Sequence, residues 1–256
     1  MKIDLPEMVC DVHVHVGDYF SGINLSFPLE KLAKIMDKYR IESALVFSSV
    51  TNSEKETRRI IKVLKNNPKI YALMRTDPEN YKLREYLKSF ERQLQTNDRI
   101  VGLKINPSTE KHRITDATYK EALEILNDNG AVLLLHCGRW VEMSGWHYGV
   151  EIAKQYPKIK VILAHMGGTH PDLSFPAIEA SKKLSNIYMD TSQTRQIIVI
   201  KRGVETLGAE RIFFGSDMPW GDYLQNLIGI LQVELNEHQL NNILKENFYR
   251  EIVGDR

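Results

Sequence analysis

The chain has 256 residues, of which 43% are hydrophobic, and its formal net charge at pH 7 is only +1. This charge balance argues against a nucleic-acid partner and against binding to an anionic membrane surface. No apolar run approaches the roughly 20 residues that cross a bilayer, and residues 1–7 lack the apolar core of a signal peptide. The two cysteines, Cys10 and Cys137, do not make a disulfide framework, so we expect a cytoplasmic protein.

Strand patterns and helix patterns alternate along the whole chain. Short apolar runs predict strands at Met8–Val16, Ser43–Phe47, Ile70–Met74, Ile100–Ile105, Ala131–His136, Ile159–Ala164, Ile187–Met189 and Ile212–Phe214. Amphipathic stretches predict helices at Leu29–Tyr39, Thr51–Lys65, Tyr81–Gln95, Thr115–Asn127, Gly149–Gln155, Ala177–Leu184, Ile197–Leu207, Tyr223–Leu231 and Gln239–Phe248. A loop is expected over Gly17–Phe27.

Eight strands that alternate with helices over about 250 residues are typical of a (β/α)8 barrel. A doubly wound open sheet has the same alternation, but it normally carries a glycine-rich turn after its first strand. Here the first strand instead ends in two histidines. No linker marks a second domain, so we expect one α/β domain over residues 1–256, a TIM barrel.

The two histidines lie in the stretch Asp11-Val12-His13-Val14-His15. Side chains alternate along a strand, so His13 and His15 should point the same way, about 7 Å apart, where they can bind one metal ion. Asp11 would share their face and could hold a ring N–H. The plain alternative is a strand whose polar face meets solvent, and a lone His-x-His motif does not decide between the two.

Further polar side chains stand at the carboxyl ends of other strands, where barrels carry their chemistry. His136 ends the fifth predicted strand, and His165 follows the sixth. Asp217 follows the eighth, and Lys104 lies near the end of the fourth. A single histidine there is most simply a core residue that satisfies a backbone carbonyl. Four histidines and an aspartate at one rim are hard to explain that way, so the pattern favours a metal site.

Several motifs together resemble the amidohydrolase superfamily, and within it the branch that includes aminocarboxymuconate-semialdehyde decarboxylase and related metal-dependent hydrolases. The motifs are His13-Val14-His15, Gly102-Leu103-Lys104, His136, Leu163-Ala164-His165-Met166-Gly167-Gly168 and Phe214-Gly215-Ser216-Asp217-Met218-Pro219-Trp220. The resemblance extends from the first strand to the region of Asn247 and Phe248. It implies a distorted (β/α)8 barrel with a divalent metal at its mouth.

Metal chemistry and the resemblance agree on a role for each strand-end residue. The expected metal ligands are His13, His15, His136 and Asp217. A divalent ion lowers the pKa of a bound water from 15.7 to roughly 7, which provides a nucleophile at neutral pH. Asp217 would accept the proton of this water and return it to the leaving group. His165 would hydrogen-bond the nucleophile or polarise a substrate oxygen.

The number of metal ions depends on Lys104. Zinc is the expected ion, with manganese as the alternative, and one ion per chain is favoured over two. In some branches of the superfamily a lysine on the fourth strand is carbamylated and bridges two metals, and His165 would then bind the second ion. In the decarboxylase-like branch the site is usually mononuclear, so we expect Lys104 to contact the substrate.

Cationic and aromatic residues at the rim indicate the kind of substrate. Arg139 and Trp140 follow the fifth strand and Trp220 follows the eighth, so these three join Lys104 as candidate substrate-binding residues. A cation flanked by aromatic rings suits a small molecule that is planar or carries a carboxylate. The plain alternative is that the tryptophans pack the loops and the arginine pairs with a nearby acid.

Two classes of enzyme use such a site. The leading interpretation is a metal-dependent hydrolase of a small-molecule amide, ester or lactone. The alternative is a metal-dependent decarboxylase of a carboxylated aromatic or unsaturated acid, which would release carbon dioxide without taking up water. A barrel that only binds a ligand is a third interpretation, and the complete ligand set argues against it. Barrels of this kind often dimerise, so a homodimer is compatible with the sequence.

Overall fold

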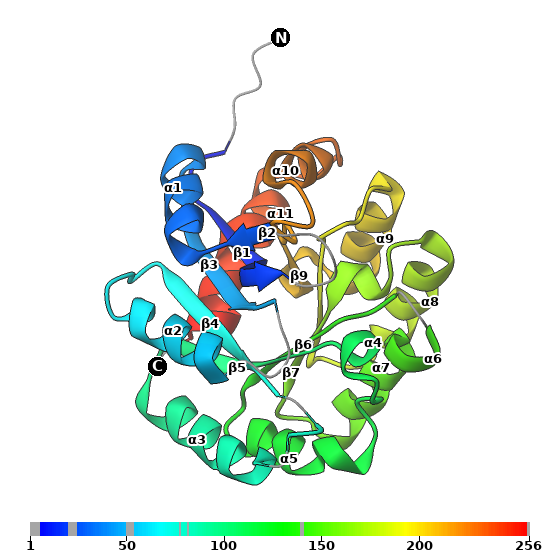
Figure 1. The fold of residues 1–256 in the computed structure, drawn as a ribbon. Helices are drawn as coiled ribbons and strands as arrows, with labels where there is room; N and C mark the ends of the chain where they lie inside the picture. Colours follow the sequence, from blue (N-terminus) through cyan, green and yellow to red (C-terminus); the bar gives the residue numbers. More distant parts are fainter. Residues whose placement is uncertain are drawn as a thin grey trace.

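A curled β-sheet forms the centre of the protein (Figure 1). The computed structural model describes residues 6–19, 25–49, 54–76, 78–80, 82–138 and 141–254. Within these residues nine strands lie in the order β2-β1-β3-β4-β5-β6-β7-β8-β9. They are β1 Val9–Tyr19, β2 Leu25–Phe27, β3 Ile41–Ser48, β4 Ile70–Arg75, β5 Ile100–Ile105, β6 Val132–Leu135, β7 Lys160–Leu163, β8 Ile187–Asp190 and β9 Ile212–Phe213. Neighbours pair in parallel, except that β2 pairs antiparallel with β1.

The sheet closes on itself where the segment after β9 returns to β1. The N–H of Asp217 donates to the carbonyl of His13 at 2.9 Å, and the N–H of His15 donates to the carbonyl of Met218 at 2.8 Å. Val14 and Met218 form an isolated parallel bridge at the same place. Because β1 and β3 to β9 are joined into one closed ring of parallel strands, the predicted α/β fold, a distorted (β/α)8 barrel, is confirmed.

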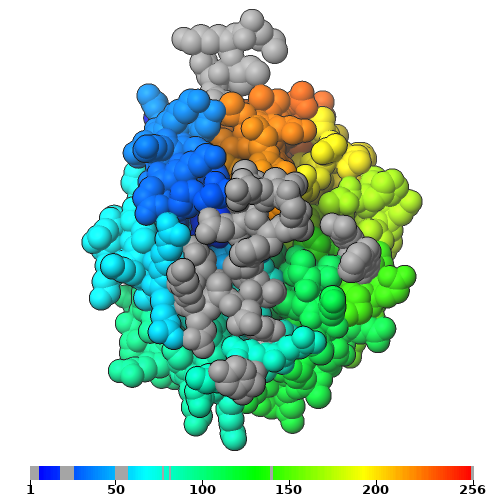
Figure 2. Space-filling view, in the orientation of Figure 1, coloured from blue at the N-terminus to red at the C-terminus, as the bar shows by residue number. Residues whose placement is uncertain are grey.

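Helices surround this barrel on its outside (Figure 1). In the described part of the chain they are α1 Leu29–Tyr39, α2 Glu54–Leu64, α3 Leu83–Thr96, α4 Pro107–Glu110, α5 Lys120–Asp128, α6 Val141–Ser144, α7 Trp146–Gln155, α8 Pro171–Ser181, α9 Ile197–Leu207, α10 Tyr223–Leu231 and α11 Glu237–Asn241. None of these described helices is long and apolar enough to cross a membrane. Helix α1, in blue, and helix α10, in orange, lie side by side in Figure 2, and between them the rings of Tyr39 and Tyr223 stack at 5.6 Å.

The predicted loop over Gly17–Phe27 is partly wrong. Strand β1 continues through Gly17 to Tyr19 and pairs with β2, so this region forms an antiparallel extension of the barrel. The φ angle of Gly17 is 107°, a backbone conformation that glycine adopts without strain and other residues avoid. Gly17 therefore lets β1 bend at the rim of the barrel and continue, whereas the sequence predicts that the strand ends there.

Helix α8 begins earlier than predicted, at Pro171 instead of Ala177. Pro171 lies in the first turn, where its missing N–H costs no hydrogen bond. Pro176, which directly precedes the predicted start, lies inside the helix, so the helix continues through a residue that normally interrupts it. The last helical region begins at Glu237 and continues as π-helical turns to Val253, beyond the predicted end at Phe248. The first residues of the predicted helices Thr51–Lys65 and Tyr81–Gln95 lie outside the described residues.

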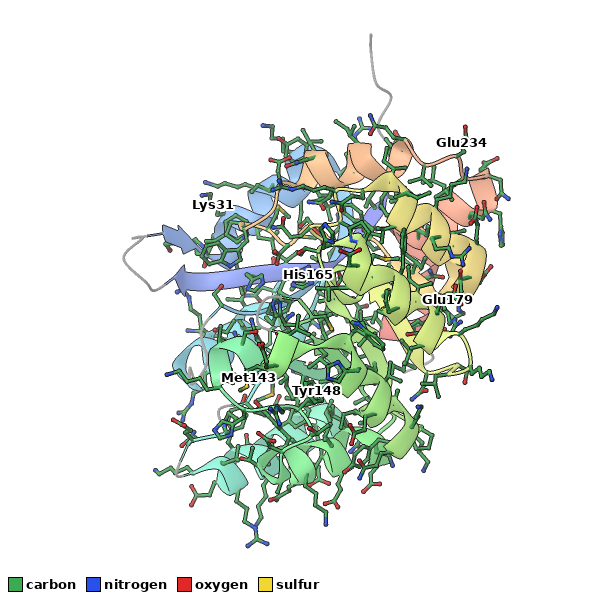
Figure 3. All side chains as sticks on the ribbon, turned by 90° about the vertical axis from the view of Figure 1, so that its right-hand side faces the viewer. Lys31, Met143, Tyr148, His165, Glu179 and Glu234 are labelled. Carbon is green, nitrogen blue, oxygen red and sulfur yellow. The ribbon has the colours of Figure 1, made fainter. Side chains whose placement is uncertain are left out.

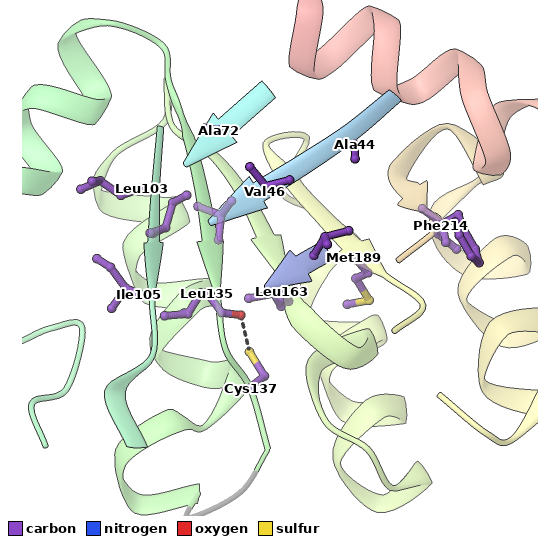
Figure 4. Close-up of a cluster of buried hydrophobic side chains, with 14 of the residues drawn as sticks. Ala44, Val46, Ala72, Leu103, Ile105, Leu135, Cys137, Leu163, Met189 and Phe214 are labelled. Atoms are coloured by element: carbon purple, nitrogen blue, oxygen red, sulfur yellow. Dashed lines mark hydrogen bonds between the residues drawn. The ribbon is translucent and has the colours of Figure 1, made fainter. Parts of the chain in front are cut away.

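The apolar core has two parts. One lies between the strands and the surrounding helices, and Figure 4 shows Leu103, Leu135 and Leu163 of three neighbouring strands within it. The other consists of residues from the opposite faces of the strands, which fill the inside of the barrel, and Phe248 and Ile252 of the C-terminal region pack against it. Because the barrel interior is packed with apolar side chains, it is a core and not a channel.

At Gly102 the strands β5 and β6 approach too closely for a larger side chain. A Cβ atom at Gly102 would lie 1.8 Å from the carbonyl oxygen of Val132, its partner in β6. We expect Gly102→Ala to lower the free energy of unfolding by about 3 kcal/mol, because backbone and not a flexible side chain is in the way. The measurement is chemical denaturation of the purified protein.

The matched control is Gly229→Ala in the middle of α10, where a Cβ would meet no atom within 4 Å. Alanine lowers the backbone entropy of the unfolded chain, so this variant should be more stable by about 0.5–1 kcal/mol. Equal effects of the two substitutions would contradict the described packing of β5 against β6.

Candidate metal centre

His13 and His15 of β1 converge with Asp217 of the segment that follows β9. The Nε2 atom of His13 lies 3.1 Å from Oδ1 of Asp217, and the Nε2 atom of His15 lies 3.0 Å from the same oxygen. The two imidazole centroids are 5.4 Å apart, and all three side chains are buried. The structure therefore brings together three of the four predicted ligands, although the carboxylate is about 200 residues away from the histidines in the chain.

His136 and His165 form the second half of this cluster. The Nδ1 atom of His136 lies 3.2 Å from Nε2 of His165. The ring of His165 stacks on the ring of His13, with centroids 5.1 Å apart. Figure 3 shows His165 in the interior of the protein, whereas Glu179 and Glu234 lie on the outside. All four predicted histidines are thus connected at one end of the barrel.

Two of these residues have an uncommon backbone conformation. Asp217 has a φ angle of 60° and His165 has one of 58°, both in the left-handed region. Residues other than glycine rarely adopt it, and where they do, they cluster at functional sites. The hydrogen bond from the N–H of Asp217 to His13 helps to hold the first of these conformations. The backbone is therefore shaped to point both side chains into the cluster.

Asp190 is a site residue that the sequence analysis missed. It is the last residue of β8, and its Oδ2 atom accepts a hydrogen bond from Nδ1 of His13 at 2.9 Å. Its Oδ1 atom accepts from the backbone N–H of His165 at 3.1 Å. Its strand-end position is the signal that also marks His136, but the predicted strand Ile187–Met189 ends one residue before it.

The prediction that Asp11 holds an imidazole ring is wrong. Its Oδ1 atom accepts from the backbone N–H groups of His13 and Ser216, each at 3.0 Å. A register shift between Asp11 and Val14 interrupts the alternation of side chains along β1, so Asp11 does not share the face of the histidines. The carboxylate that supports the ring of His13 is that of Asp190.

The two carboxylates next to His13 are ionised. Burial alone would raise their pKa values, but His13 and the hydrogen bonds to it outweigh burial and hold the pKa of Asp190 at about 2. The pKa of Asp217 lies well below its usual value, because His13 and His15 act on it in the same way. In turn, burial and Lys104 lower the pKa of His13, but the two carboxylates prevail and raise it above its usual value.

The other three histidines are neutral. Burial lowers the pKa of His15 to about 3, although the hydrogen bond to Asp217 opposes this shift. Burial also lowers the pKa of His136 and of His165, and the charge of each neighbouring histidine or lysine adds to it. A neutral imidazole has a free lone pair, which is the form in which histidine binds a metal ion.

Lys104 lies fully buried beside these groups. Its Nζ atom is 3.4 Å from Nε2 of His13 and 4.9 Å from the centroid of the Phe47 ring. Burial lowers the pKa of Lys104 to about 8, and the carboxylates of Asp190 and Asp217 limit that shift. The structure therefore places the predicted substrate contact within the cluster.

Of the remaining candidate substrate residues, the structure describes Trp220. Trp220 is 48% exposed and so lies at the surface. Arg139 and Trp140 lie outside the described residues. Arg75, a nearby cation at the end of β4, donates to Oε1 of Glu110 at 2.7 Å inside the protein, so it is engaged in a buried ion pair.

The donor set fits a divalent metal ion. Two imidazole nitrogens and a carboxylate oxygen, from His13, His15 and Asp217, lie within 4.8 Å of one another. Nitrogen and carboxylate ligands of this kind are typical of zinc sites in enzymes. The carboxylate of Asp190 accepts a hydrogen bond from Nδ1 of His13, an arrangement that is usual for a metal-binding histidine. These three residues, with His136 beside them, are the ones that could hold the ion.

Comparison with known families agrees with this centre. The model of the amidohydrolase family matches residues 10–247, which is nearly the whole chain. The chain belongs to the amidohydrolase family. The resemblance inferred from the sequence motifs is thereby confirmed, and the protein is an enzyme of this family. No curated protein sequence matches this amidohydrolase.

Solved structures share its fold over almost their entire length. One is the 5-carboxyvanillate decarboxylase from Sphingomonas paucimobilis, with a TM-score of 0.72 and 17% identity over 96% of this chain and 99% of that chain. Another is a dihydroxybenzoic acid decarboxylase from Polaromonas sp. JS666, with a TM-score of 0.75 and 13% identity over 98% of each chain. A third is an amidohydrolase from Burkholderia multivorans, with a TM-score of 0.76 and 12% identity over 95% of this chain and 98% of that chain.

Two of these three structures contain a metal ion. The Polaromonas enzyme was crystallised with manganese and the inhibitor 2-nitroresorcinol, and the Burkholderia protein with zinc.

Elemental analysis of the purified protein tests the metal centre. We expect close to one zinc or manganese ion per chain and its loss in His13→Ala, because His13 lies at the centre of the cluster. His238→Ala, which removes an exposed histidine of α11, is the control and should keep the metal. Two ions per chain would move Lys104 and His165 into the ligand set. Full metal content in His13→Ala would contradict the site.

Proposed function

We propose that this amidohydrolase is a metal-dependent decarboxylase of a small carboxylated aromatic or unsaturated acid. The observation that carries the proposal is a buried cluster of histidines and carboxylates with the lysine Lys104 next to it. The fold likeness to decarboxylases of 5-carboxyvanillate and dihydroxybenzoic acid supports it further. The alternative of the sequence analysis is therefore better supported than the hydrolase that it placed first.

The metal ligands in this proposal are His13, His15, His136 and Asp217, with one ion per chain, zinc first and manganese second. Bound there, a divalent ion supplies positive charge for an anionic substrate. Lys104 would contact the same anion, and its low pKa would rise on pairing with it. Arg139, Trp140 and Trp220 stay proposed contacts of the planar part of the substrate.

The proton chemistry falls to Asp217 and His165. When the bond between the carbon and its carboxylate breaks, carbon dioxide leaves and the electron pair stays on the carbon. A proton must then reach that carbon. Asp217 at a carboxylate oxygen and His165 at the lone pair of Nε2 are the groups of the cluster that can take up a proton and then pass it to that carbon. The two residues therefore keep their proposed catalytic roles.

The test is to incubate the metal-loaded enzyme in D2O with hydroxylated and methoxylated benzoic acids, including 5-carboxyvanillate and dihydroxybenzoates. We expect release of carbon dioxide and a product with one deuterium at the vacated carbon. Amides, esters and lactones of the same ring systems are tested in parallel. Hydrolysis of these compounds without release of carbon dioxide from any acid would contradict the proposal and restore the hydrolase.

Asp217→Asn separates proton transfer from metal binding in the same assay. An amide oxygen can still bind a metal ion but cannot carry the proton, so this variant should keep most of its metal and lose at least about 100-fold in turnover. Turnover near that of the wild type would remove Asp217 from the proton-transfer role.

A further inference from the structure

The end of β8 and the segment that follows it contact the residues of the metal centre at several points. The carboxylate of Asp190 holds the first histidine of the His-x-His motif. The hydroxyl of Ser192 lies 2.8 Å from Nδ1 of His165, and Gln193 donates to Asp217 at 3.0 Å. Asp190, Ser192 and Gln193 thus each support one residue of the cluster, although the sequence motifs do not mark them.

Asp190 determines which ring nitrogen of His13 carries a proton. An ionised carboxylate can only accept hydrogen bonds, and its Oδ2 atom lies 2.9 Å from Nδ1 of His13. The proton of the neutral ring is therefore on Nδ1. Nε2 lies 3.4 Å from Nζ of Lys104, and an ammonium can only donate, so Nε2 of the neutral ring accepts with its lone pair. Oδ1 of Asp217, 3.1 Å from Nε2, would hold a second proton there only in the charged ring.

Ser192 extends the same constraint to His165. Nδ1 of His165 lies 3.1 Å from the carbonyl oxygen of Ser192, which can only accept. The hydroxyl of Ser192 donates its single proton to Oδ1 of Asp190, so it too can only accept from the ring at 2.8 Å. His165 must carry its proton on Nδ1, and its Nε2 lone pair faces His136.

These groups also lie close enough together to suggest a second metal site. His13, His165 and Asp190 offer donor atoms within 4.8 Å of one another. However, the oxygens of Asp190 already accept bonds from both histidines and from the N–H and hydroxyl of Ser192. The Ser192 hydroxyl is also within 3.2 Å of both Nδ1 atoms. Oδ1 of Asp190 is thus shared by three donors, and the Nδ1 atoms of both rings donate to oxygens and offer no lone pair, so these contacts orient the rings and do not favour a second ion.

We propose that Asp190 is the positioning residue of the metal centre, which fixes the Nδ1–H tautomer of His13 directly and that of His165 through Ser192. Both Nε2 atoms then present lone pairs, the form in which an imidazole binds a metal or receives a proton. The proposal rests on the proposed roles of His13 and His165, but its test reads the two rings themselves and the zinc affinity, not turnover.

The test compares Asp190→Asn with Asp11→Asn in the zinc-loaded protein. Both variants replace a fully buried carboxylate of the barrel by an amide of the same shape. The Asp11 carboxylate, however, accepts from the backbone N–H of His13 and not from its ring. In Asp190→Asn the amide N–H of the new side chain can donate to Nδ1 of His13. This favours the tautomer with its proton on Nε2, so zinc binding should weaken about 10- to 100-fold. Asp11→Asn should leave the zinc affinity unchanged.

Nitrogen-15 NMR of histidine-labelled, zinc-loaded protein reads the tautomers. The wild type should show protonated Nδ1 atoms in His13 and His165. Asp190→Asn should shift the Nδ1–H signals of both rings, and Ser192→Ala mainly that of His165. If Asp190→Asn does not fold, the tautomers of the wild type and the nitrogen-15 spectrum of Ser192→Ala decide whether the proposal holds.

A proton on Nε2 of His165 in the wild type would overturn the proposal. Equal losses of zinc affinity in Asp190→Asn and Asp11→Asn would overturn it as well. The predicted tautomers in a protein that decarboxylates no acid would contradict the proposed function and leave the role of Asp190 intact.

Discussion

Backbone pairing between β1 and the segment after β9 is the interaction on which both the fold and the metal centre depend. The hydrogen bonds that join His13 to Asp217 and His15 to Met218 close the barrel. They also hold a carboxylate against two imidazoles that come from the other end of the chain. Each such bond contributes only about 1 kcal/mol to stability, but a shift of one residue would turn every side chain to the opposite face.

Closing the barrel in this way buries charge, which is costly unless each ionised group has partners. Asp217 faces two imidazoles and the amide of Gln193, and Asp190 faces a ring, two backbone N–H groups and a hydroxyl. Lys104 is different, because the contacts of its ammonium group are with an imidazole and an aromatic ring. A buried ammonium in such surroundings is stabilised by an anion, which is why this lysine supports an acidic substrate in the proposed function.

Sequence patterns identify the site where a polar side chain follows a clear apolar strand, as for His136, His165 and Asp217. The alternation of strands and helices likewise predicts the barrel. The sequence patterns do not identify Asp190, because β8 has only four residues and the partner of Asp190, His13, lies 177 residues away. No local pattern encodes such a contact. The role given to Asp11 is wrong for a related reason, since a bulge in β1 leaves the alternating sequence unchanged while it turns side chains to the other face.

A crystal structure of the metal-loaded protein, with anomalous diffraction at the absorption edge of the bound metal, tests the metal centre most directly. We expect one strong anomalous peak within binding distance of Nε2 of His13, Nε2 of His15 and a carboxylate oxygen of Asp217. A barrel with these side chains in place but with no peak at that position, or with its metal elsewhere, would contradict it.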